Sequence, residues 1–410
     1  MRILKLLTSF LLIYSLNSVA KKDESTSFVV EMIANNVEER SQIANEIHID
    51  SIENDRIFSV VSADEMQRLY KMHSEKIITT SVLNENAVKD FSFLAATMDF
   101  PSRDEKFHTY DEMYEDLKAL ESEYPDLASV FSIGKSVLGK DIWGIKISGK
   151  RSEAEELVPA IAYLGTHHAR EHLSTEMPIM LAQKLLDEYH LDGNIKNLID
   201  GNEVYIIPMV NPDGAMYDIE GGRYKSWRKN RRSNANGSYG VDLNRNYGYG
   251  WGTGGSSSNP YSEVYMGESA FSEPETQAVK EFFLAHENIT IALSFHTFSE
   301  LILYPWGGLY EGVGGEDEAI FKKMATDMAQ MNHYDPMQSS ELYIASGDTC
   351  DWLYGELNVF CFTFELSPSS IWGGGFYPGA SVIDTVFDDN WEPILYLLDR
   401  AADPRSALDL

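Results

Sequence analysis

The sequence predicts an α/β protein: a single αβα domain with a central, mixed and mostly buried sheet, preceded by a small ferredoxin-like βαββαβ domain. Two observations lead to this fold class. In the longer, C-terminal part of the chain, continuous apolar runs of strand length alternate with helical patterns, which is typical of strands covered on both faces. In the N-terminal part, short patterns follow one another in the order β-α-β-β-α-β.

Composition limits the possible functions. The 410 residues include 33 Lys and Arg against 64 Asp and Glu, a formal net charge of −31. This acidic excess argues against nucleic acid as a partner, since phosphate binding requires basic side chains. The hydrophobic fraction of 43% is sufficient for a sizeable core, but only 2 cysteines are present. Any metal site therefore has to consist of His and carboxylate ligands rather than a thiolate cluster.

The first element, residues 1–20, has the pattern of a signal peptide. Arg2 and Lys5 give a charged start, an apolar run with a few polar interruptions extends to Leu16, and Ser18–Ala20 offers a small-x-small cleavage pattern. The alternative, a membrane anchor, is disfavoured because the run is short for about 30 Å of hydrocarbon. No later apolar run is long enough to span a bilayer. We therefore expect a secreted protein, extracellular or periplasmic, without a membrane partner.

The second element, residues 21–100, contains the small N-terminal domain. Its strand and helix patterns are, in order, SFVVEMI, VEERSQIANE, EIHID, RIFSVVS, ADEMQRLYKMH and KIITTSV. Residues 101–106 follow as a connector, in which Pro101, Arg103 and Lys106 indicate an accessible chain. A small exported domain joined to a larger one by a basic, cleavable linker suggests a pro-segment. The alternative is an ordinary accessory domain.

Residues 107–402 form the large domain, and residues 403–410 are a C-terminal tail. Two capping boxes, Thr109-x-x-Glu112 and Ser272-x-x-Glu275, predict helix starts. Buried strands are expected at PAIAYLG, EVYIIPMV, TIALSFH and VFCFTFEL. Helices are expected near Thr175–Tyr189, Pro274–His286, Asp317–Met331 and Asn390–Ala401.

Ionisable residues follow three of these buried strands. PAIAYLG leads into the segment THHAREH at 166–172, TIALSF ends at His296, and VFCFTF ends at Glu365. In open α/β sheets, ligands bind outside the carboxyl ends of the strands, so these groups should meet at one edge of the sheet. Each of them alone is more often a structural residue than a functional one. Their convergence is what indicates a site.

The residue types and their spacing at this edge suit a zinc site. His168 and Glu171 are three residues apart and share a face of a helical turn, and His296 supplies a third ligand. Such a tripod leaves a fourth position for water, whose pKa zinc lowers towards about 7. Glu365 is then the candidate general base. The other two His residues of THHAREH flank the ligands and are not expected to bind metal.

Several segments of the large domain resemble the zinc carboxypeptidases of the carboxypeptidase A type. They are GTHHAREH, PMVNPDG, WRKNRR, GVDLNRNY, SFHTFSELILYPWG, YIASGDTCDW and FTFEL. Their order and spacing match across nearly all of residues 107–402, and HHAREH and SELILYPWG are especially similar to the secreted bacterial carboxypeptidase T branch. The resemblance implies a carboxypeptidase-like fold. In pattern, the small N-terminal domain is also similar to the inhibitory pro-segment of that family.

The resemblance implies roles for individual residues in metal binding and catalysis. His168, Glu171 and His296 would bind one Zn²⁺. Glu365 would act as the base, and Arg228, in the WRK motif, would stabilise the oxyanion. The last role agrees with the physical expectation that a guanidinium stabilises negative charge developing in a partly dry site.

The resemblance also implies residues that bind the end of a peptide. Asn244 and Arg245 would bind the free terminal carboxylate, for which the planar fork of an arginine is suited. Tyr343 would close over the same carboxylate, and Arg170 would give a secondary contact. Asp242 matches an aspartate that orients the first metal-binding histidine through its other ring nitrogen.

Three further residues are expected around the substrate's last side chain. Cys350 falls at the position that sets side-chain preference in the family, and a small uncharged residue there suggests an apolar or unselective pocket. Asp348 can instead accept a Lys or Arg, and Thr363 is assigned to the same pocket. Cys350 and Cys361 either pair in an oxidising compartment or stay as two inert thiols. Because Cys361 lies in a buried strand run, we expect thiols.

The sequence thus predicts the secreted zymogen of a zinc metallocarboxypeptidase. It would release single C-terminal residues, apolar and in part basic, from peptides or proteins through attack of zinc-bound water. An activating protease would be a further partner, the bacterial branch implies structural Ca²⁺, and we expect a monomer. One alternative is a zinc amidase or carboxypeptidase of the same fold that acts on cell-wall peptides. A more remote one is an inactive module that binds peptide C-termini, although the chain keeps all ligands and the base.

Overall fold

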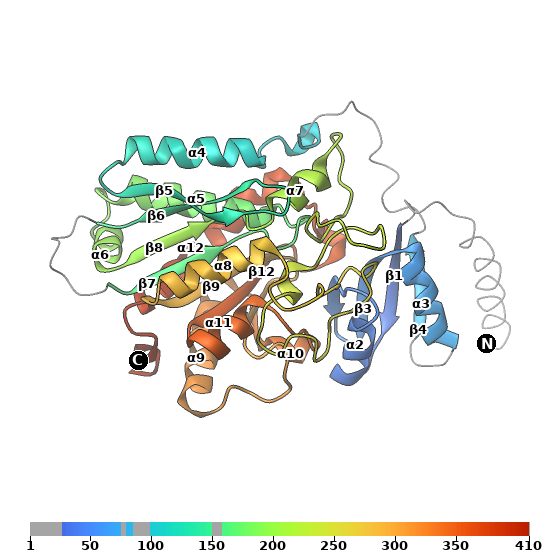
Figure 1. The fold of residues 1–410 in the computed structure, drawn as a ribbon. Helices are drawn as coiled ribbons and strands as arrows, with labels where there is room; N and C mark the ends of the chain where they lie inside the picture. The colour runs from blue at the N-terminus through green and yellow to red at the C-terminus, as the bar shows by residue number, and fades with distance from the viewer. Residues whose placement is uncertain (1–26, 75–78, 85–98, 150–157, 410) are drawn as a thin grey trace.

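The computed structural model describes residues 27–74, 79–84, 99–149 and 158–409, which form a small domain beside a larger α/β domain (Figure 1). The predicted signal peptide at residues 1–20 lies outside the described residues. Among the residues that are described, no helix combines the length and the apolar character needed to cross a bilayer.

The small domain is a four-stranded antiparallel sheet with the strand order β2-β3-β1-β4, as in a ferredoxin-like fold. Its elements are β1 (Ser27–Ile33), α2 (Val37–Ala44), β2 (Ser51–Glu53), β3 (Arg56–Ser62), α3 (Ala63–Ser74) and β4 (Thr79–Asn84). Alternate side chains of β1, such as Val30 and Met32, pack with Ile43 of α2 and Leu69 of α3. The predicted fold of this domain is confirmed.

One strand of the small domain lies later in the chain than predicted. The sequence EIHID at 46–50, expected to be a strand, is irregular, and β2 covers only Ser51–Glu53. His48 and Asp50 are turned towards the large domain instead, where they line a cavity between the two domains. These residues therefore make contacts outside their own sheet, which a strand pattern does not reveal.

The large domain is built on a mixed sheet with the strand order β11-β10-β12-β9-β7-β8-β6-β5. The four central strands β12, β9, β7 and β8 are parallel, and antiparallel pairs join β10 to β12 and connect β8, β6 and β5. The strands are β5 (Ala128–Lys135), β6 (Asp141–Ile147), β7 (Ala160–Leu164), β8 (Glu203–Ile207), β9 (Ile289–Thr297), β10 (Leu301–Tyr304), β11 (Asp335–Gln338) and β12 (Phe360–Leu366). The predicted mixed sheet is confirmed.

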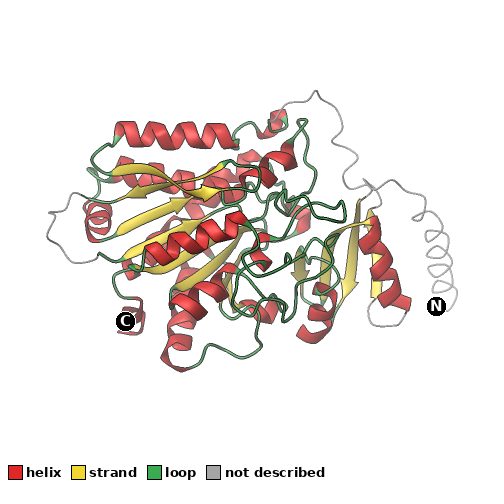
Figure 2. Cartoon of the chain, viewed as in Figure 1, coloured by secondary structure: helices red, strands yellow, loops and turns green. Residues whose placement is uncertain are grey.

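Helices cover both faces of this sheet (Figure 2). One face packs against α4 (Tyr110–Glu123), α5 (Leu173–Glu188), α9 (Gly315–Asn332) and α12 (Ile383–Arg400), and the other against α8 (Pro274–Ala285) and α11 (Thr349–Leu357). The shorter helices are α6 (Gly193–Gly201), α7 (Pro212–Ile219) and α10 (Ser339–Leu342). In β7, Tyr163 joins the first core and Ala162 the second. The central strands are continuous apolar runs because neither face meets water.

The two predicted capping boxes have different outcomes. Thr109 and Glu112 cap α4 reciprocally through side chain and backbone, as predicted. The second prediction is wrong, because α8 begins after Glu273 without a side-chain cap. Glu275 is not available for capping, since its Oε1 accepts the Val137 N–H at 2.8 Å.

The connector predicted at residues 101–106 is packed against the large domain. Phe100 and Phe107, which flank it, belong to the large hydrophobic core. Asp104 has an exposed fraction of 0% and accepts a hydrogen bond from the Tyr224 hydroxyl at 2.7 Å. The large domain therefore holds the chain from Phe100 onward, although the basic side chains of the connector remain exposed.

His108, at the start of the large domain, makes fold stability depend on pH. Its Nδ1 lies 2.7 Å from Glu176 and its Nε2 lies 2.9 Å from Asp116. Burial lowers the pKa of His108, but the two carboxylates outweigh burial and raise the pKa to about 9. The charged imidazole thus stabilises the fold fully below its unfolded pKa of about 6.5, and this contribution is lost as the pH rises through about 9.

We expect His108→Gln to lower the melting temperature by about 2–4 °C at pH 6, and by clearly less at pH 10. Thermal unfolding followed by circular dichroism across this range measures the difference. His190→Gln, at an exposed position, is the control. A difference that stays constant with pH would contradict the charged state of His108.

Candidate metal centre and substrate cleft

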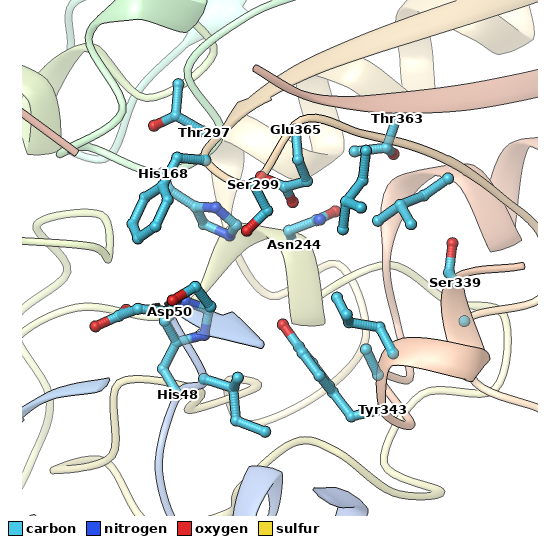
Figure 3. Close-up of a pocket in the computed structure, with 18 of the residues that line it drawn as sticks. His48, Asp50, His168, Asn244, Thr297, Ser299, Ser339, Tyr343, Thr363 and Glu365 are labelled. Atoms are coloured by element: carbon cyan, nitrogen blue, oxygen red, sulfur yellow. Dashed lines mark ion pairs between the residues drawn. The ribbon is translucent and has the colours of Figure 1, made fainter. Parts of the chain in front are cut away.

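A cavity lies where the carboxyl ends of the central strands face the small domain. Arg228 lines it from the large domain. His168 and Glu365 of the large domain also line it, opposite His48 and Asp50 of the small domain (Figure 3). The groups that follow different strands of the sheet are therefore brought together at one edge, as the parallel arrangement of these strands requires.

Three potential metal ligands converge beside this cavity. His168 and Glu171 lie in the turn between β7 and α5, and His296 lies near the end of β9. The His168 Nδ1 is 2.8 Å from a Glu171 oxygen and 3.1 Å from the His296 Nδ1, which is itself 2.9 Å from the other Glu171 oxygen. All three residues are buried.

The geometry of these atoms fits one small cation. The Nδ1 atoms of His168 and His296 lie 3.1 Å apart, and each also faces an oxygen of the Glu171 carboxylate, so that the donor atoms of all three side chains are directed at one place. A zinc ion with bonds of about 2.0–2.2 Å is compatible with this spacing, and two His and one carboxylate are the donor set of zinc sites that keep an open position. Glu171 is held in place by the Thr297 N–H, which donates to it at 3.1 Å.

Asp242 joins the metal-binding histidine to an arginine. Its Oδ1 lies 3.2 Å from the His168 Nε2, and its Oδ2 accepts from the Arg228 Nε at 3.0 Å. Although burial raises the pKa of Asp242, the charges of Arg228 and His168 outweigh it and hold that pKa well below its usual range. Asp242 therefore fixes the ring of His168, with Nδ1 facing the ligand cluster, and orients Arg228 next to it.

Glu365 lies next to the three potential metal ligands but is not one of them. It lies in β12 and pairs in register with His296 of the neighbouring strand β9. Burial raises the pKa of Glu365 to about 7, even though the charge of His296 acts in the opposite direction. A carboxyl group with such a pKa can both accept and return a proton near neutral pH.

Asn244, Arg245 and Tyr343 line the same cavity. Arg245 is anchored by hydrogen bonds from its Nε to the Gly255 carbonyl at 2.9 Å and from its NH1 to the Asn244 carbonyl at 2.8 Å. The Asn244 side-chain oxygen accepts two hydrogen bonds from Thr349. Tyr343 packs against the core of the small domain, and in Figure 3 its hydroxyl points into the cavity.

Arg170 is placed apart from the residues that line this cavity. Its side chain is buried and donates from NH2 to the Asp50 Oδ1 at 3.0 Å. Its guanidinium carbon also lies 4.0 Å from the ring centroid of Phe376. In this structure, Arg170 is thus paired with a carboxylate of the small domain.

The predicted side-chain pocket is brought together in part. Asp348 and Thr363 line the cavity, whereas Cys350 does not. The expectation of two free thiols is wrong, because Cys350 and Cys361 form a disulfide with a Cα–Cα distance of 5.0 Å. Helix α11 packs on the sheet at β12, so that Cys350 in its first turn faces the strand that carries Cys361.

Sequence analysis missed the contribution of the small domain to this site. His48 and Asp50 were assigned to a strand, and no pattern indicated that they reach the cleft. The remaining His residues of THHAREH have partners outside the cluster, as expected. His167 lies 2.9 Å from the Tyr247 hydroxyl, and His172 lies 2.9 Å from Asp218.

The fold and this site define a class of protein. A mixed α/β sheet whose strand ends hold a buried His–Glu–His cluster beside a further carboxyl group is the arrangement of a metal-dependent hydrolase. Comparison with known proteins gives the family: the zinc carboxypeptidase family profile matches residues 113–393. The chain therefore belongs to the zinc carboxypeptidases and is a metallocarboxypeptidase that binds one zinc ion.

Individual relatives agree with this family. The chain is 35% identical over 298 residues to a zinc carboxypeptidase of Saccharothrix mutabilis subsp. capreolus, which covers 70% of this chain and 68% of the relative. It is 32% identical over 301 residues to mouse carboxypeptidase A1, and the match covers 72% of this chain and 70% of the mouse protein. A crystal structure of carboxypeptidase A from Helicoverpa armigera matches with a TM-score of 0.77 and 25% identity, covering 94% of this chain and 98% of the other.

Proposed function

We propose that this metallocarboxypeptidase is exported as an inactive zymogen and, once its small domain is removed, releases single apolar or basic residues from peptide C-termini. The observation that carries the proposal is the position of His48 and Asp50, which line the cleft beside the metal-binding residues. A peptide substrate needs the same space. Residues 21–100 would then be an inhibitory pro-segment, and residues 107–402 the catalytic domain.

The contacts of Arg228 and Arg170 with the small domain support an inhibitory role for that domain. The Arg228 NH1 lies 3.1 Å from the His48 Nε2, and the Arg170 NH2 donates to Asp50 at 3.0 Å. Burial and the charges of both arginines lower the pKa of His48 well below its usual value, so that this ring is neutral and can accept a hydrogen bond from Arg228. Both guanidinium groups are therefore engaged before a substrate arrives.

The small domain also holds two loops that border the substrate cleft. The Ser41 hydroxyl oxygen accepts the Ile344 N–H at 3.1 Å, directly after Tyr343. The Asn45 side chain accepts the Gly255 N–H at 2.8 Å. Since the Gly255 carbonyl is the acceptor of the Arg245 side chain, these contacts reach the surroundings of Tyr343 and Arg245, two of the three residues that we assign to the terminal carboxylate.

Peptide hydrolysis would use these residues in the following way. Arg245 and Asn244 bind the free carboxylate of the substrate, and Tyr343 covers it. When bound, zinc supplies a Lewis acid that polarises the scissile carbonyl and favours attack by water. Glu365 takes a proton from the attacking water and delivers it to the leaving amine, and Arg228 donates hydrogen bonds to the oxygen that becomes negative.

Asp348 supports the acceptance of basic side chains. Its Oδ2 is buried and has no hydrogen-bond partner within the described part of the chain, while its Oδ1 accepts the Asp351 N–H at 3.0 Å at the start of α11. Asp348 lines the cavity next to Gly307, where a Cβ atom would come within 3.0 Å of the Oδ2. An unpaired buried carboxylate oxygen is costly, and the ammonium or guanidinium of a C-terminal Lys or Arg would supply its partner.

Asp348→Asn should therefore change substrate preference. We expect kcat/KM for peptides that end in Arg or Lys to fall at least about tenfold, and for peptides that end in Leu or Phe to stay within about threefold, because one charge-assisted hydrogen bond is lost. Asparagine keeps an oxygen for the N-cap, so that α11 is preserved. The peptides differ only in their last residue and include D-Ala, which tests cell-wall peptides as the alternative substrate. Equal losses for all ends would contradict this role.

The zymogen itself is tested by limited proteolysis. The full chain is expected to be inactive, and hydrolysis of a chromogenic peptide should rise after cleavage. We place this cut just before Phe100 rather than in the linker predicted at residues 101–106, because the large domain holds the chain from Phe100 onward. Cleavage removes the contacts of His48 and Asp50 with the two arginines. At about 1.5–3 kcal/mol for each charge-assisted contact, the rate of hydrolysis should rise about 10²–10⁴-fold. His48→Ala combined with Asp50→Ala should raise the activity of the uncut chain. Full activity of the uncut wild type would contradict the proposal.

A further inference from the structure

A buried carboxylate outside the metal centre, Asp218, joins three segments of the active site. It lies in α7 with an exposed fraction of 0%. Its Oδ1 accepts the Trp227 N–H at 2.7 Å, and its Oδ2 lies 2.9 Å from the His172 Nε2 and accepts from the Tyr377 hydroxyl at 3.1 Å. A carboxylate can accept all of these bonds because it offers only acceptor positions.

Two partners of Asp218 are direct neighbours of residues that line the cleft, and a third, Tyr377, lies in the loop that packs against Arg170. His172 follows the metal ligand Glu171, and Trp227 precedes Arg228. Tyr377 follows Phe376, whose ring packs against the Arg170 guanidinium at 4.0 Å. Asp218 thus connects the ligand turn, the turn that carries Arg228 and the loop that supports Arg170.

The turn that carries Arg228 requires external support. Ser226 has a φ of 57°, in the left-handed region that is unfavourable for residues other than glycine. After this residue, the Trp227 N–H is directed into Asp218, and the Arg228 carbonyl accepts the Ala169 N–H at 2.9 Å. The backbone of Arg228 is therefore held from both sides.

The two ends of Arg228 have different supports. Asp242 orients the guanidinium, whose Nε donates to it at 3.0 Å. The backbone from which this side chain extends depends on Asp218. Tyr377, the donor from the opposite loop, is itself fixed by stacking on Tyr224 with ring centroids 3.9 Å apart.

We propose that Asp218 is a positioning residue that sets the place of Arg228 relative to the reacting carbonyl. The inference rests on the proposed function, in which Arg228 stabilises the developing negative charge. That charge exists in the transition state and is small in the bound substrate, so a displaced Arg228 affects kcat more than KM. Asp218 itself is expected to touch neither zinc nor peptide.

A double-mutant cycle on the full chain, activated by proteolysis, tests this coupling. Asp218→Asn is expected to lower kcat about 10–100-fold and to change KM less than about threefold, with zinc content unchanged. In the Arg228→Ala background, the same substitution should change kcat by less than about threefold, because the group that it positions is already absent. Asp388→Asn, an exposed carboxylate of α12, is the matched control.

The outcomes separate this inference from the proposed function. Suppose that Arg228→Ala lowers kcat, but that Asp218→Asn lowers kcat by the same factor whether or not Arg228 is present. The positioning role of Asp218 is then overturned, while the role of Arg228 stands. If Arg228→Ala leaves kcat unchanged, the proposed role of Arg228 fails first. Should Asp218→Asn not fold, Tyr377→Phe enters the same cycle, since it removes one hydrogen bond to Asp218 and keeps the ring. A loss that is non-additive with Arg228→Ala supports the inference, and an additive loss overturns it.

Discussion

Exchange of Glu365 for glutamine is expected to lower kcat by about 10²–10⁴-fold while the protein still binds one zinc ion, because a general base is lost without loss of a ligand. Glutamine is nearly isosteric with glutamate and cannot accept a proton at neutral pH. The ligand atoms come from His168, Glu171 and His296, so the metal-binding set stays complete.

Two measurements separate this role from a structural one. Steady-state hydrolysis of a peptide substrate gives kcat, and elemental analysis gives the zinc content of the same preparation. Glu287→Gln, at an exposed position after α8, is the control for a change of charge. Hydrolysis by the Glu365 variant at a rate close to that of the wild type would remove Glu365 from the mechanism.

Replacement of Arg245 by alanine should abolish the preference for substrates with a free terminal carboxylate. Arg245 lines the cavity, and its anchoring to the Gly255 and Asn244 carbonyls directs the guanidinium there. Loss of a charge-assisted hydrogen bond of about 1.5–3 kcal/mol corresponds to a fall in kcat/KM of about 10- to 150-fold. Arg245→Lys, which keeps the charge but not the planar fork, should recover only part of this loss.

The readout is the ratio of kcat/KM for a peptide acid to that for the corresponding C-terminal amide. This ratio should approach one in the alanine variant. Arg405→Ala, which removes an exposed arginine far along the chain, should leave the ratio unchanged. A ratio that persists in Arg245→Ala would place the carboxylate site elsewhere in the cleft.

Much of the fold could be predicted because burial leaves a strong signal. Strands such as β7 and β9 are covered on both faces and are therefore unbroken apolar runs. Predictions failed where a polar side chain is committed to a distant partner. Glu275 matches a capping box, yet it binds Val137 in another part of the chain. Asp104 lies in a polar stretch that indicates an accessible connector, yet it is buried against Tyr224.

The metal-binding residues could be proposed from the sequence because two of them, His168 and Glu171, are close in the chain and all three follow buried strands. The contribution of His48 and Asp50 could not be proposed from the sequence, because the docking of one domain on another follows no periodic pattern. The disulfide was missed for a related reason. Cys350 begins a helix and Cys361 lies in a strand, and only the packing of that helix on the sheet brings their sulfur atoms together.

The covalent link between α11 and β12 bears on how active protein can be produced. In the chain-entropy account, closing the loop between Cys350 and Cys361, which are 11 positions apart, stabilises the fold by about 3 kcal/mol. The helix that it secures begins directly after Asp348, at the wall of the cleft. In a bacterial cytoplasm, glutathione and thioredoxin keep sulfhydryl groups reduced, so protein produced there would lack the disulfide that holds this helix to the sheet. Expression routed through the periplasm or the endoplasmic reticulum supplies the oxidant that it requires.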